Sequence, residues 1–160
     1  MDTFFCQQPQ LWPGRFAFGV MAPGAAQVAA LEKRCFSDPW SERSVASELE
    51  NKLSYWLVAV EDGQVLGYIG SQSVLGESDM MNVAVHPDHR RKGIAEALVN
   101  ALVEALKERG SHSLTLEVRA SNEPAQKLYE KLGFVLVGRR PRYYRNPRED
   151  ALILRKEWEV

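Results

Sequence analysis

One run in the middle of the chain constrains its fold more than any other: Met81-Asn-Val-Ala-Val-His-Pro-Asp-His-Arg90-Arg-Lys-Gly-Ile-Ala95. An apolar strand stops at a proline, and a basic turn that contains glycine then opens a long amphipathic helix. The first N–H groups of a helix have no partners inside it, and the helix dipole favours anions at that end. Gly93 would let a bulky anion approach the backbone closely, and the basic residues just before it add positive charge. The run therefore predicts a phosphate-binding turn.

Two common classes of phosphate-binding loop are absent. The chain has no G-x-x-x-x-G-K-[ST] run, which excludes a mononucleotide P-loop, and no G-x-G-x-x-G run, which excludes a Rossmann fingerprint. The run instead contains R-x-x-G-x-A, from Arg90 through Gly93 to Ala95. Taken alone, such a basic helix start is more often a solvated helix N-terminus than a binding site.

A second motif downstream favours a binding site over a solvated helix N-terminus. The segment from Asn122 to Phe134 follows the pattern N-x-x-A-x-x-x-Y-x-x-x-G-F. Together with R-x-x-G-x-A, it resembles the two signatures of the GCN5-related N-acetyltransferase (GNAT) superfamily, in the order in which that superfamily has them. Within it, Leu116-Glu-Val-Arg-Ala-Ser-Asn122 and Phe36-Ser-Asp-Pro-Trp-Ser-Glu42 resemble the bacterial ribosomal-protein-alanine N-acetyltransferases. The resemblance covers roughly residues 21–156.

Strand and helix patterns alternate through the middle of the chain, so we expect an α/β fold with one mixed sheet and helices on both faces. The resemblance implies the GNAT fold, whose sheet is mostly antiparallel. Residues 1–14 read as an irregular N-terminal arm, and residues 15–160 as a single N-acetyltransferase domain. Expected strands are 15–21, 55–61, 64–72, 79–85, 113–118, 134–140 and 151–156, and expected helices are 25–34, 41–51, 92–109 and 124–132. Asp62-Gly63 is a strong hairpin-turn signal between two of these strands.

The composition argues against several other classes of protein. The chain has 20 Lys and Arg against 21 Asp and Glu, whereas a nucleic-acid-binding domain is normally basic. No apolar run approaches the length of a membrane span, so we expect a soluble, cytoplasmic protein with no membrane partner. Cys6 and Cys35 lack the spacing of zinc or redox motifs, and the three histidines lie in turn-like contexts. We therefore expect no metal.

Glu117 is the candidate general base. Strand alternation places it with Thr115 on the face opposite Leu116, so the simplest alternative is a carboxylate that points to solvent. The resemblance implies that Glu117 accepts a proton from the attacking amine. A direct transfer from an α-ammonium of pKa ~8 to a free carboxyl of pKa ~4.3 is uphill by about 5 kcal/mol. One solution is that burial of the carboxyl raises its pKa and so reduces the difference from the amine. The other is that the proton leaves only as the nitrogen becomes acidic during attack, either directly or through a water molecule.

Tyr129 is the candidate acid. A tyrosine on a short helix is more often a core aromatic, but the resemblance implies that this one donates a proton to the departing CoA sulfur. Full deprotonation of a phenol of pKa ~10 by a thiolate of pKa ~8.5 costs roughly 2 kcal/mol. A hydrogen bond to the sulfur could therefore supply much of the benefit.

The resemblance also implies acetyl-CoA as the cosubstrate. Backbone N–H groups of the strand before the turn are the expected donors to the oxyanion. Asn122 is a predicted helix N-cap that, by resemblance, also contacts the cofactor. The residues expected to bind acetyl-CoA are Val83, Ala84, Val85, Arg90, Arg91, Lys92, Gly93, Ile94, Ala95, Glu96 and Asn122.

The acceptor is the least constrained part of the prediction. The resemblance implies the N-terminal alanine of a ribosomal protein, small-subunit protein eighteen, and places Tyr143 and Tyr144 beside the substrate opening. The same chemistry could act on a small-molecule amine or a lysine side chain, and a third alternative is a non-catalytic acetyl-CoA-binding module. The arginine-rich segment 139–148 reads most simply as a solvated hairpin.

Overall fold

The computed structural model describes residues 10–11, 17–20, 25–36, 39–61 and 64–159. Its helices are α1 Ala25–Cys35, α2 Glu42–Glu50, α3 Ile94–Glu108 and α4 Glu123–Lys131, with a short 3-10 turn at Pro87–His89. Its strands are β1 Gln10–Leu11, β2 Ala17–Val20, β3 Ser54–Glu61, β4 Gln64–Val74, β5 Glu77–Val85, β6 Ser113–Arg119, β7 Val135–Tyr144 and β8 Glu149–Glu157.

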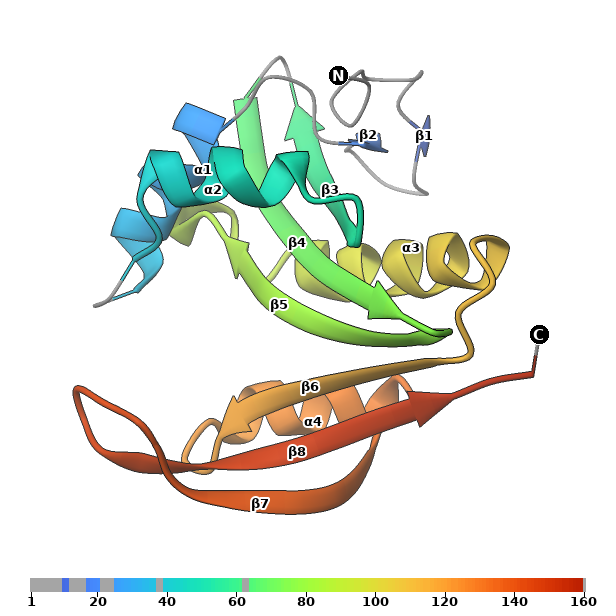
Figure 1. Cartoon of the computed structure of the whole chain (residues 1–160). Helices are drawn as coiled ribbons and strands as arrows, with labels where there is room; N and C mark the ends of the chain where they lie inside the picture. Colours follow the sequence, from blue (N-terminus) through green and yellow to red (C-terminus); the bar gives the residue numbers. More distant parts are fainter. Residues whose placement is uncertain (1–9, 12–16, 21–24, 37–38, 62–63, 160) are drawn as a thin grey trace.

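The strands form one sheet in the order β1-β2-β3-β4-β5-β6-β8-β7. Only the β5–β6 pair is parallel, and every other neighbouring pair is antiparallel. Helices α1 and α2 cover one face of the sheet, whereas α3 and α4 lie on the other (Figure 1). The predicted α/β architecture, a mixed and mostly antiparallel sheet with helices on both faces, is confirmed.

Two apolar clusters lie on the two faces of the sheet. The cluster under α1 and α2 contains Val28, Val45, Trp56 and Tyr68. The larger cluster under α3 and α4 contains the predicted stripe of α3, whose four members are each at most 1 % exposed: Ile94, Leu98, Leu102 and Leu106. Burial of each such side chain stabilises the fold by about 1.5–3 kcal/mol, so α3 is held by its packing rather than by helix propensity.

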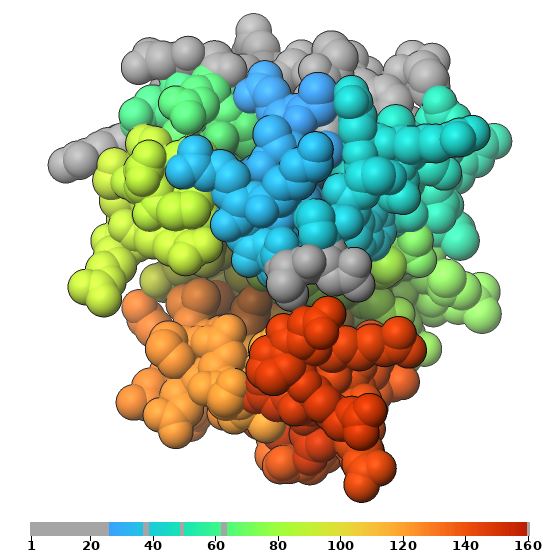
Figure 2. Space-filling model, turned by 90° about the vertical axis from the view of Figure 1, so that its left-hand side faces the viewer, coloured from blue at the N-terminus to red at the C-terminus, as the bar shows by residue number. Residues whose placement is uncertain are grey.

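Strands β5 and β6 separate soon after they meet. They pair over only three positions, from Glu77↔Ser113 to Asp79↔Thr115. Beyond that point β5 continues along β4 to Val85, and β6 continues along β8 to Arg119, so the two halves of the sheet diverge (Figure 1). Figure 2 looks onto this open end of the molecule. Beyond Asp79↔Thr115, the facing edges of β5 and β6 pair with no other strand of the described residues, which is what a ligand inserted between them would require.

A bulge in β5 lies where the strands separate. The β4–β5 register changes between Gly70↔Asn82 and Ser71↔Met80, so Met81 has no partner on β4. A β-bulge bends its strand and re-aims the residues beside it. Here it redirects the second half of β5 away from β6.

Most predicted elements are present, with ends shifted by a few residues. Ser41 caps α2 as predicted, accepting a hydrogen bond of 3.1 Å from the Ser44 N–H. Helix α3 starts at Ile94 rather than Lys92 because Gly93 has a left-handed backbone conformation. Within the expected N-terminal arm, Gln10–Leu11 form a two-residue strand that pairs with β2. The rest of that arm and the Asp62-Gly63 turn lie outside the described residues.

Candidate active site

The turn between β5 and α3 has an open helix N-terminus. Gly93 is the N-cap of α3 with φ 79°, and no side chain caps the helix there. A Cβ added at Gly93 would meet no atom within 4 Å, so the space above the turn is open. Arg91 also has a positive φ, of 64°. The free N–H groups at the start of α3 and this open space together suit an anion.

The basic side chains of the turn are only partly engaged. Arg90 Nε donates to the carbonyl oxygen of Val85 at 3.3 Å, and Lys92 Nζ lies 3.2 Å from His89 Nδ1. Glu96 Oε2 pairs with Lys131 Nζ of α4 at 3.2 Å. These contacts arrange the turn while leaving its positive charges at the surface.

Glu117 lies at the centre of β6, on the face opposite its buried neighbours Leu116 and Val118. Its side chain is only 28 % exposed. Oε1 lies 3.9 Å from Arg140 Nε, whereas Oε2 is buried with no hydrogen-bond partner among the described residues. The simplest alternative, a carboxylate that merely points to solvent, does not fit an unpaired buried oxygen, because such a group is costly unless a donor reaches it.

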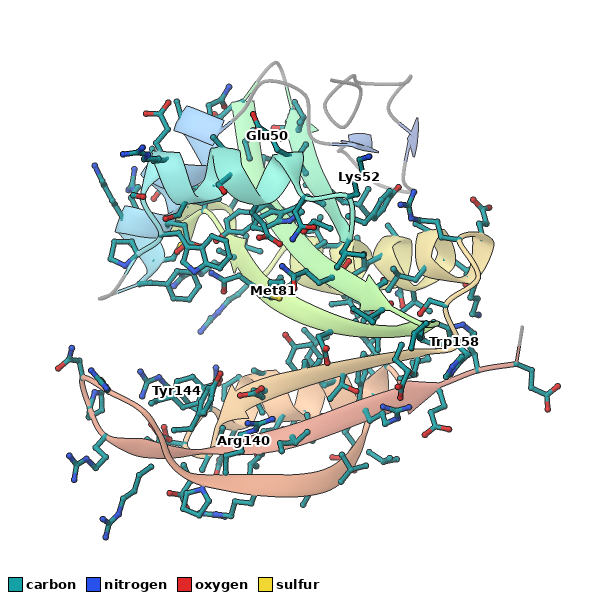
Figure 3. All side chains as sticks on the ribbon, in the orientation of Figure 1. Glu50, Lys52, Met81, Arg140, Tyr144 and Trp158 are labelled. Carbon is teal, nitrogen blue, oxygen red and sulfur yellow. The ribbon has the colours of Figure 1, made fainter. Side chains whose placement is uncertain are left out.

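Two tyrosines of β7 stand beside this carboxylate. Partial desolvation, reinforced by the Glu117 carboxylate, raises the pKa of Tyr143. The same two causes raise the pKa of Tyr144 to about 12. Their rings meet edge to face with centroids 5.0 Å apart, and Arg119 lies 4.4 Å above the Tyr144 ring. We refer to the gap between the diverging strands β5 and β6 as the opening. Figure 3 shows Tyr144 and Arg140 on one side of it and Met81 of β5 on the other.

Tyr129 reaches the opening from the other face of the sheet. Its ring is 6 % exposed and packs edge to face on Phe134, with centroids 5.5 Å apart. Its hydroxyl lies 4.0 Å from Met80 Sδ of β5, so it spans from α4 to the opposite strand. Burial, with a smaller contribution from Tyr144, raises the pKa of Tyr129 to about 12. Tyr129 is therefore a core aromatic whose hydroxyl stays protonated and available as a donor.

The β4–β5 register separates the three predicted backbone donors of β5. The His86 N–H bonds the Leu66 carbonyl at 2.7 Å, and Ala84 lies opposite Tyr68 in the same register. Bonded pairs alternate with non-bonded pairs in an antiparallel ladder, so the Ala84 N–H is directed to β4. The N–H groups of Val83 and Val85 point away from β4, and these two remain the candidate donors.

Asn122 occupies the predicted capping position. It is the N-cap of α4, and its Oδ1 accepts a hydrogen bond of 3.2 Å from the Ala125 N–H. The capping role is confirmed, whereas contact with a cofactor stays a prediction.

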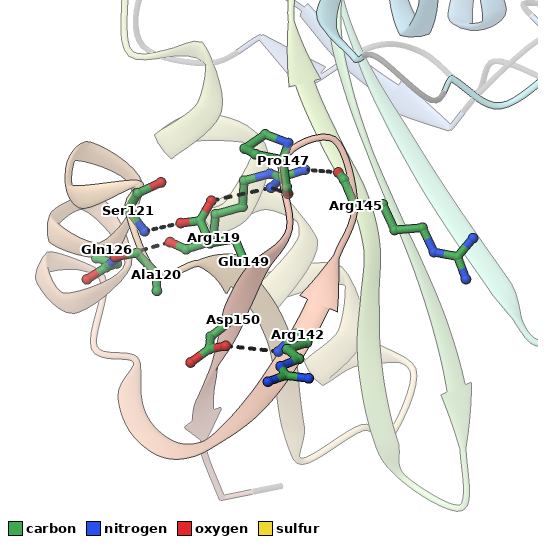
Figure 4. Close-up of polar contacts among 9 residues, drawn as sticks. All are labelled: Arg119, Ala120, Ser121, Gln126, Arg142, Arg145, Pro147, Glu149 and Asp150. Atoms are coloured by element: carbon green, nitrogen blue, oxygen red, sulfur yellow. Dashed lines mark hydrogen bonds and ion pairs between the residues drawn. The ribbon is translucent and has the colours of Figure 1, made fainter.

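The β7–β8 hairpin is largely solvated, as expected for residues 139–148, but it is also bonded to the end of β6. Arg119 donates to the carbonyl oxygens of Arg145 and Pro147, each at 3.0 Å, and pairs with Glu149 (Figure 4). Asp150 Oδ1 accepts from the Arg142 N–H at 2.9 Å. These bonds fix the two tyrosines of β7 beside Glu117.

Sequence reasoning did not single out Asp79, Met80, Asn82 or Arg140, all of which lie at or near the opening. Partial desolvation, followed by the charges of Glu117 and Glu77, raises the pKa of Asp79. The only sequence signal for this residue was its place at the start of an expected strand. No pattern in the sequence predicts the bulge that brings Met80 against Tyr129.

Two further features bear on the class of site. Within the described ranges, no three His, Cys, Asp or Glu side chains gather as a metal site would require. No helix of the described part of the chain is both long and apolar enough to span a membrane.

Comparison with known proteins places the chain in a family. The family model described as "Acetyltransferase (GNAT) family" matches residues 25–134. The chain belongs to this family. It is accordingly an N-acetyltransferase, and the match spans both motifs on which the predicted family rested, at residues 90–95 and 122–134.

The relatives include the [ribosomal protein bS18]-alanine N-acetyltransferase of Escherichia coli K12, which is 41% identical over 127 residues, or 78% of this chain and 84% of the relative. The crystal structure of the Escherichia coli ribosomal-protein-S18-alanine N-acetyltransferase superposes with a TM-score of 0.79 at 36% identity, covering 85% of this chain and 88% of that one. Arabidopsis thaliana NAA60 in complex with acetyl-CoA has a TM-score of 0.80 at 19% identity, covering 89% and 98%, and shares the fold.

Proposed function

We propose that this N-acetyltransferase transfers the acetyl group of acetyl-CoA to the α-amine of an N-terminal alanine, and that its protein substrate is ribosomal protein bS18. The observation that carries the chemistry is the buried Oε2 of Glu117, which has no hydrogen-bond partner among the described residues and lies on β6 where that strand diverges from β5. The names of relatives that are about 40% identical support the acceptor.

The residues of the β5–α3 turn fit the diphosphate of acetyl-CoA. The uncapped N-terminus of α3 supplies N–H donors, and the space above Gly93 is open. Arg90, Arg91 and Lys92 supply charge around it. Acetyl-CoA brings the activated thioester, and the Val83 and Val85 N–H groups are directed to the gap in which that thioester would lie.

The reaction forms one bond and breaks one. The amine nitrogen attacks the thioester carbonyl carbon, the C–N bond forms, and the C–S bond breaks. Glu117 Oε2 accepts the proton that nitrogen loses, and Tyr129 donates a hydrogen bond to the sulfur as negative charge develops on it. With a Tyr129 pKa of about 12, full proton transfer to a thiolate of pKa ~8.5 would cost about 5 kcal/mol. Tyr129 therefore acts chiefly by hydrogen bonding.

Gly93→Leu is expected to raise the dissociation constant of acetyl-CoA by at least about 10-fold, because a side chain would fill the space that the diphosphate needs. Isothermal titration calorimetry measures it. Gly110→Leu is the matched control, because Gly110 lies just beyond the other end of α3, also has a positive φ, and also has no atom within 4 Å of an added Cβ. Equal affinities in the two variants would contradict the placement of the diphosphate at Gly93.

The acceptor is tested with two peptides. The first copies the alanine-initiated N-terminus of bS18, and the second has a blocked N-terminus and one lysine. We expect strong preference for the first, partly because an α-amine of pKa ~8 is more often neutral than a lysine of pKa ~10.4. Single-turnover acetylation followed by mass spectrometry gives both rates. Comparable rates would favour a lysine or small-molecule acceptor, and no transfer to any amine would favour the non-catalytic module.

A further inference from the structure

Glu32 is a buried carboxylate that the proposed chemistry does not use. It lies on α1, is 1 % exposed, and collects three donors from three different segments. The Tyr68 hydroxyl of β4 and Asn82 Nδ2 of β5 both donate to Oε1, and the Trp40 N–H donates to Oε2 at 3.2 Å. Burial, and then the hydrogen bond to Glu32, raises the pKa of Tyr68, so this phenol stays protonated and keeps donating.

This carboxylate decides which way the Asn82 amide faces. A carboxylate only accepts hydrogen bonds, so the amide must present its NH2 group to Glu32. Its carbonyl then faces the opposite way, and Oδ1 accepts from the Val83 N–H at 3.1 Å. The chain of contacts therefore runs from α1 to one particular backbone N–H of β5.

The Val83 N–H is one of the two β5 donors that point away from β4. It follows the Met81 bulge and points away from β4, towards the gap between β5 and β6. Under the proposed function, it is the first β5 donor beyond the bulge that can reach the thioester oxygen. In the absence of a ligand, the Val83 N–H donates to Asn82 Oδ1.

We propose that Asn82, oriented by Glu32, is a positioning residue for acetyl transfer. It holds the Val83 N–H in the direction of the thioester oxygen and yields it when acetyl-CoA binds. The donor is then already aimed at the place where negative charge develops, and no reorganisation is needed during the reaction. This inference rests on the proposed use of acetyl-CoA, but not on the identity of the acceptor.

Two variants separate positioning from simple stabilisation of the fold. Asn82→Ala removes the acceptor of the Val83 N–H, whereas Tyr68→Phe removes another donor to Glu32 together with a 3.3 Å contact to Asn82 Nδ2, and leaves the hydrogen bond from Asn82 to Glu32 in place. We expect Asn82→Ala to lower kcat by about 10-fold, which is less than the ~10²–10³-fold cost of deleting an oxyanion donor. The dissociation constant of the Asn82→Ala variant for CoA should stay close to the wild-type value. The kcat of the Tyr68→Phe variant should also stay close to the wild-type value. Equal loss of kcat in both variants would overturn the proposal.

A second measurement needs neither a variant nor an acceptor. The Val83 amide resonance of the wild-type protein is followed by NMR during titration with acetyl-CoA and, separately, with CoA, which lacks the carbonyl. We expect acetyl-CoA to move this resonance well beyond the shift caused by CoA. Identical shifts, or none, would overturn the proposal even if Asn82→Ala failed to fold. If the wild-type protein acetylated no alanine-initiated peptide, the proposed acceptor would be wrong, while this readout would still test whether the Val83 N–H meets the thioester carbonyl, on which the proposed role of Asn82 depends.

Discussion

Glu117→Gln is expected to lower kcat for acetyl transfer by about 10²–10⁴-fold and to leave the dissociation constant of acetyl-CoA nearly unchanged. Glutamine keeps the volume of the side chain but cannot take a proton from the amine. Glu117 lies on β6 and not in the proposed phosphate-binding turn before α3, so cofactor binding should not depend on its carboxylate. Single-turnover rates and calorimetry on the same preparations measure the two quantities.

Glu77→Gln is a matched control for this experiment. Glu77 lies on β5 and pairs with Arg155 at 3.1 Å, so the change removes one negative charge from the same part of the sheet without touching the proposed base. Its rate should stay close to wild type. A Glu117→Gln variant that turned over normally at neutral pH would restore the simpler interpretation of Glu117 as a surface carboxylate.

Tyr129→Phe is expected to lower the rate of acetyl transfer by about 10²-fold, at the low end for acid catalysis, because a phenol of pKa about 12 contributes a hydrogen bond more than a proton. The fold should persist, since phenylalanine keeps the edge-to-face contact with Phe134. Single-turnover kinetics with an alanine-initiated peptide measure the rate, and thermal unfolding checks the fold.

The raised pKa of Tyr129 also predicts how the rate of acetyl transfer depends on pH. A raised pKa keeps Tyr129 protonated at pH 10.0, where an unperturbed tyrosine is half ionised. The wild-type rate should therefore not fall through loss of this proton as the pH passes 10.0. Tyr55→Phe is the control, because Tyr55 is also partly buried but lies under Arg109 beyond the C-terminal end of α3. If Tyr129→Phe were as active as this control, Tyr129 would have only a packing role.

Local signals explain why so much of the secondary structure could be predicted. The apolar stripe of α3, the Ser41 cap of α2 and the glycine that precedes Ile94 each depend on residues within a few positions of one another. The same holds for the predicted phosphate-binding turn, because a strand end, a glycine and a helix N-terminus are adjacent in the chain. The two GNAT motifs are short for this reason and could be read directly.

The surroundings of the candidate catalytic residues depend on distant segments. The Met81 bulge is an irregularity in the pairing of β5 with β4, and beyond it β5 and β6 each follow a different antiparallel neighbour. The unpaired oxygen of Glu117 likewise depends on β7, whose tyrosines and Arg140 stand beside it.

The amino-acid sequence was sufficient to predict the fold class, the phosphate turn and the identities of the candidate base and acid. Only the tertiary structure showed that the Ala84 N–H points to β4, whereas the N–H groups of Val83 and Val85 point to the gap between β5 and β6. It alone joined Glu32 to Val83 through Asn82, across 50 positions between Glu32 and Asn82. The physical reason is that motifs and helix or strand patterns depend on residues close together in the sequence. The direction of an N–H group or a carboxylate oxygen is instead set by strand register and by neighbours remote in the chain.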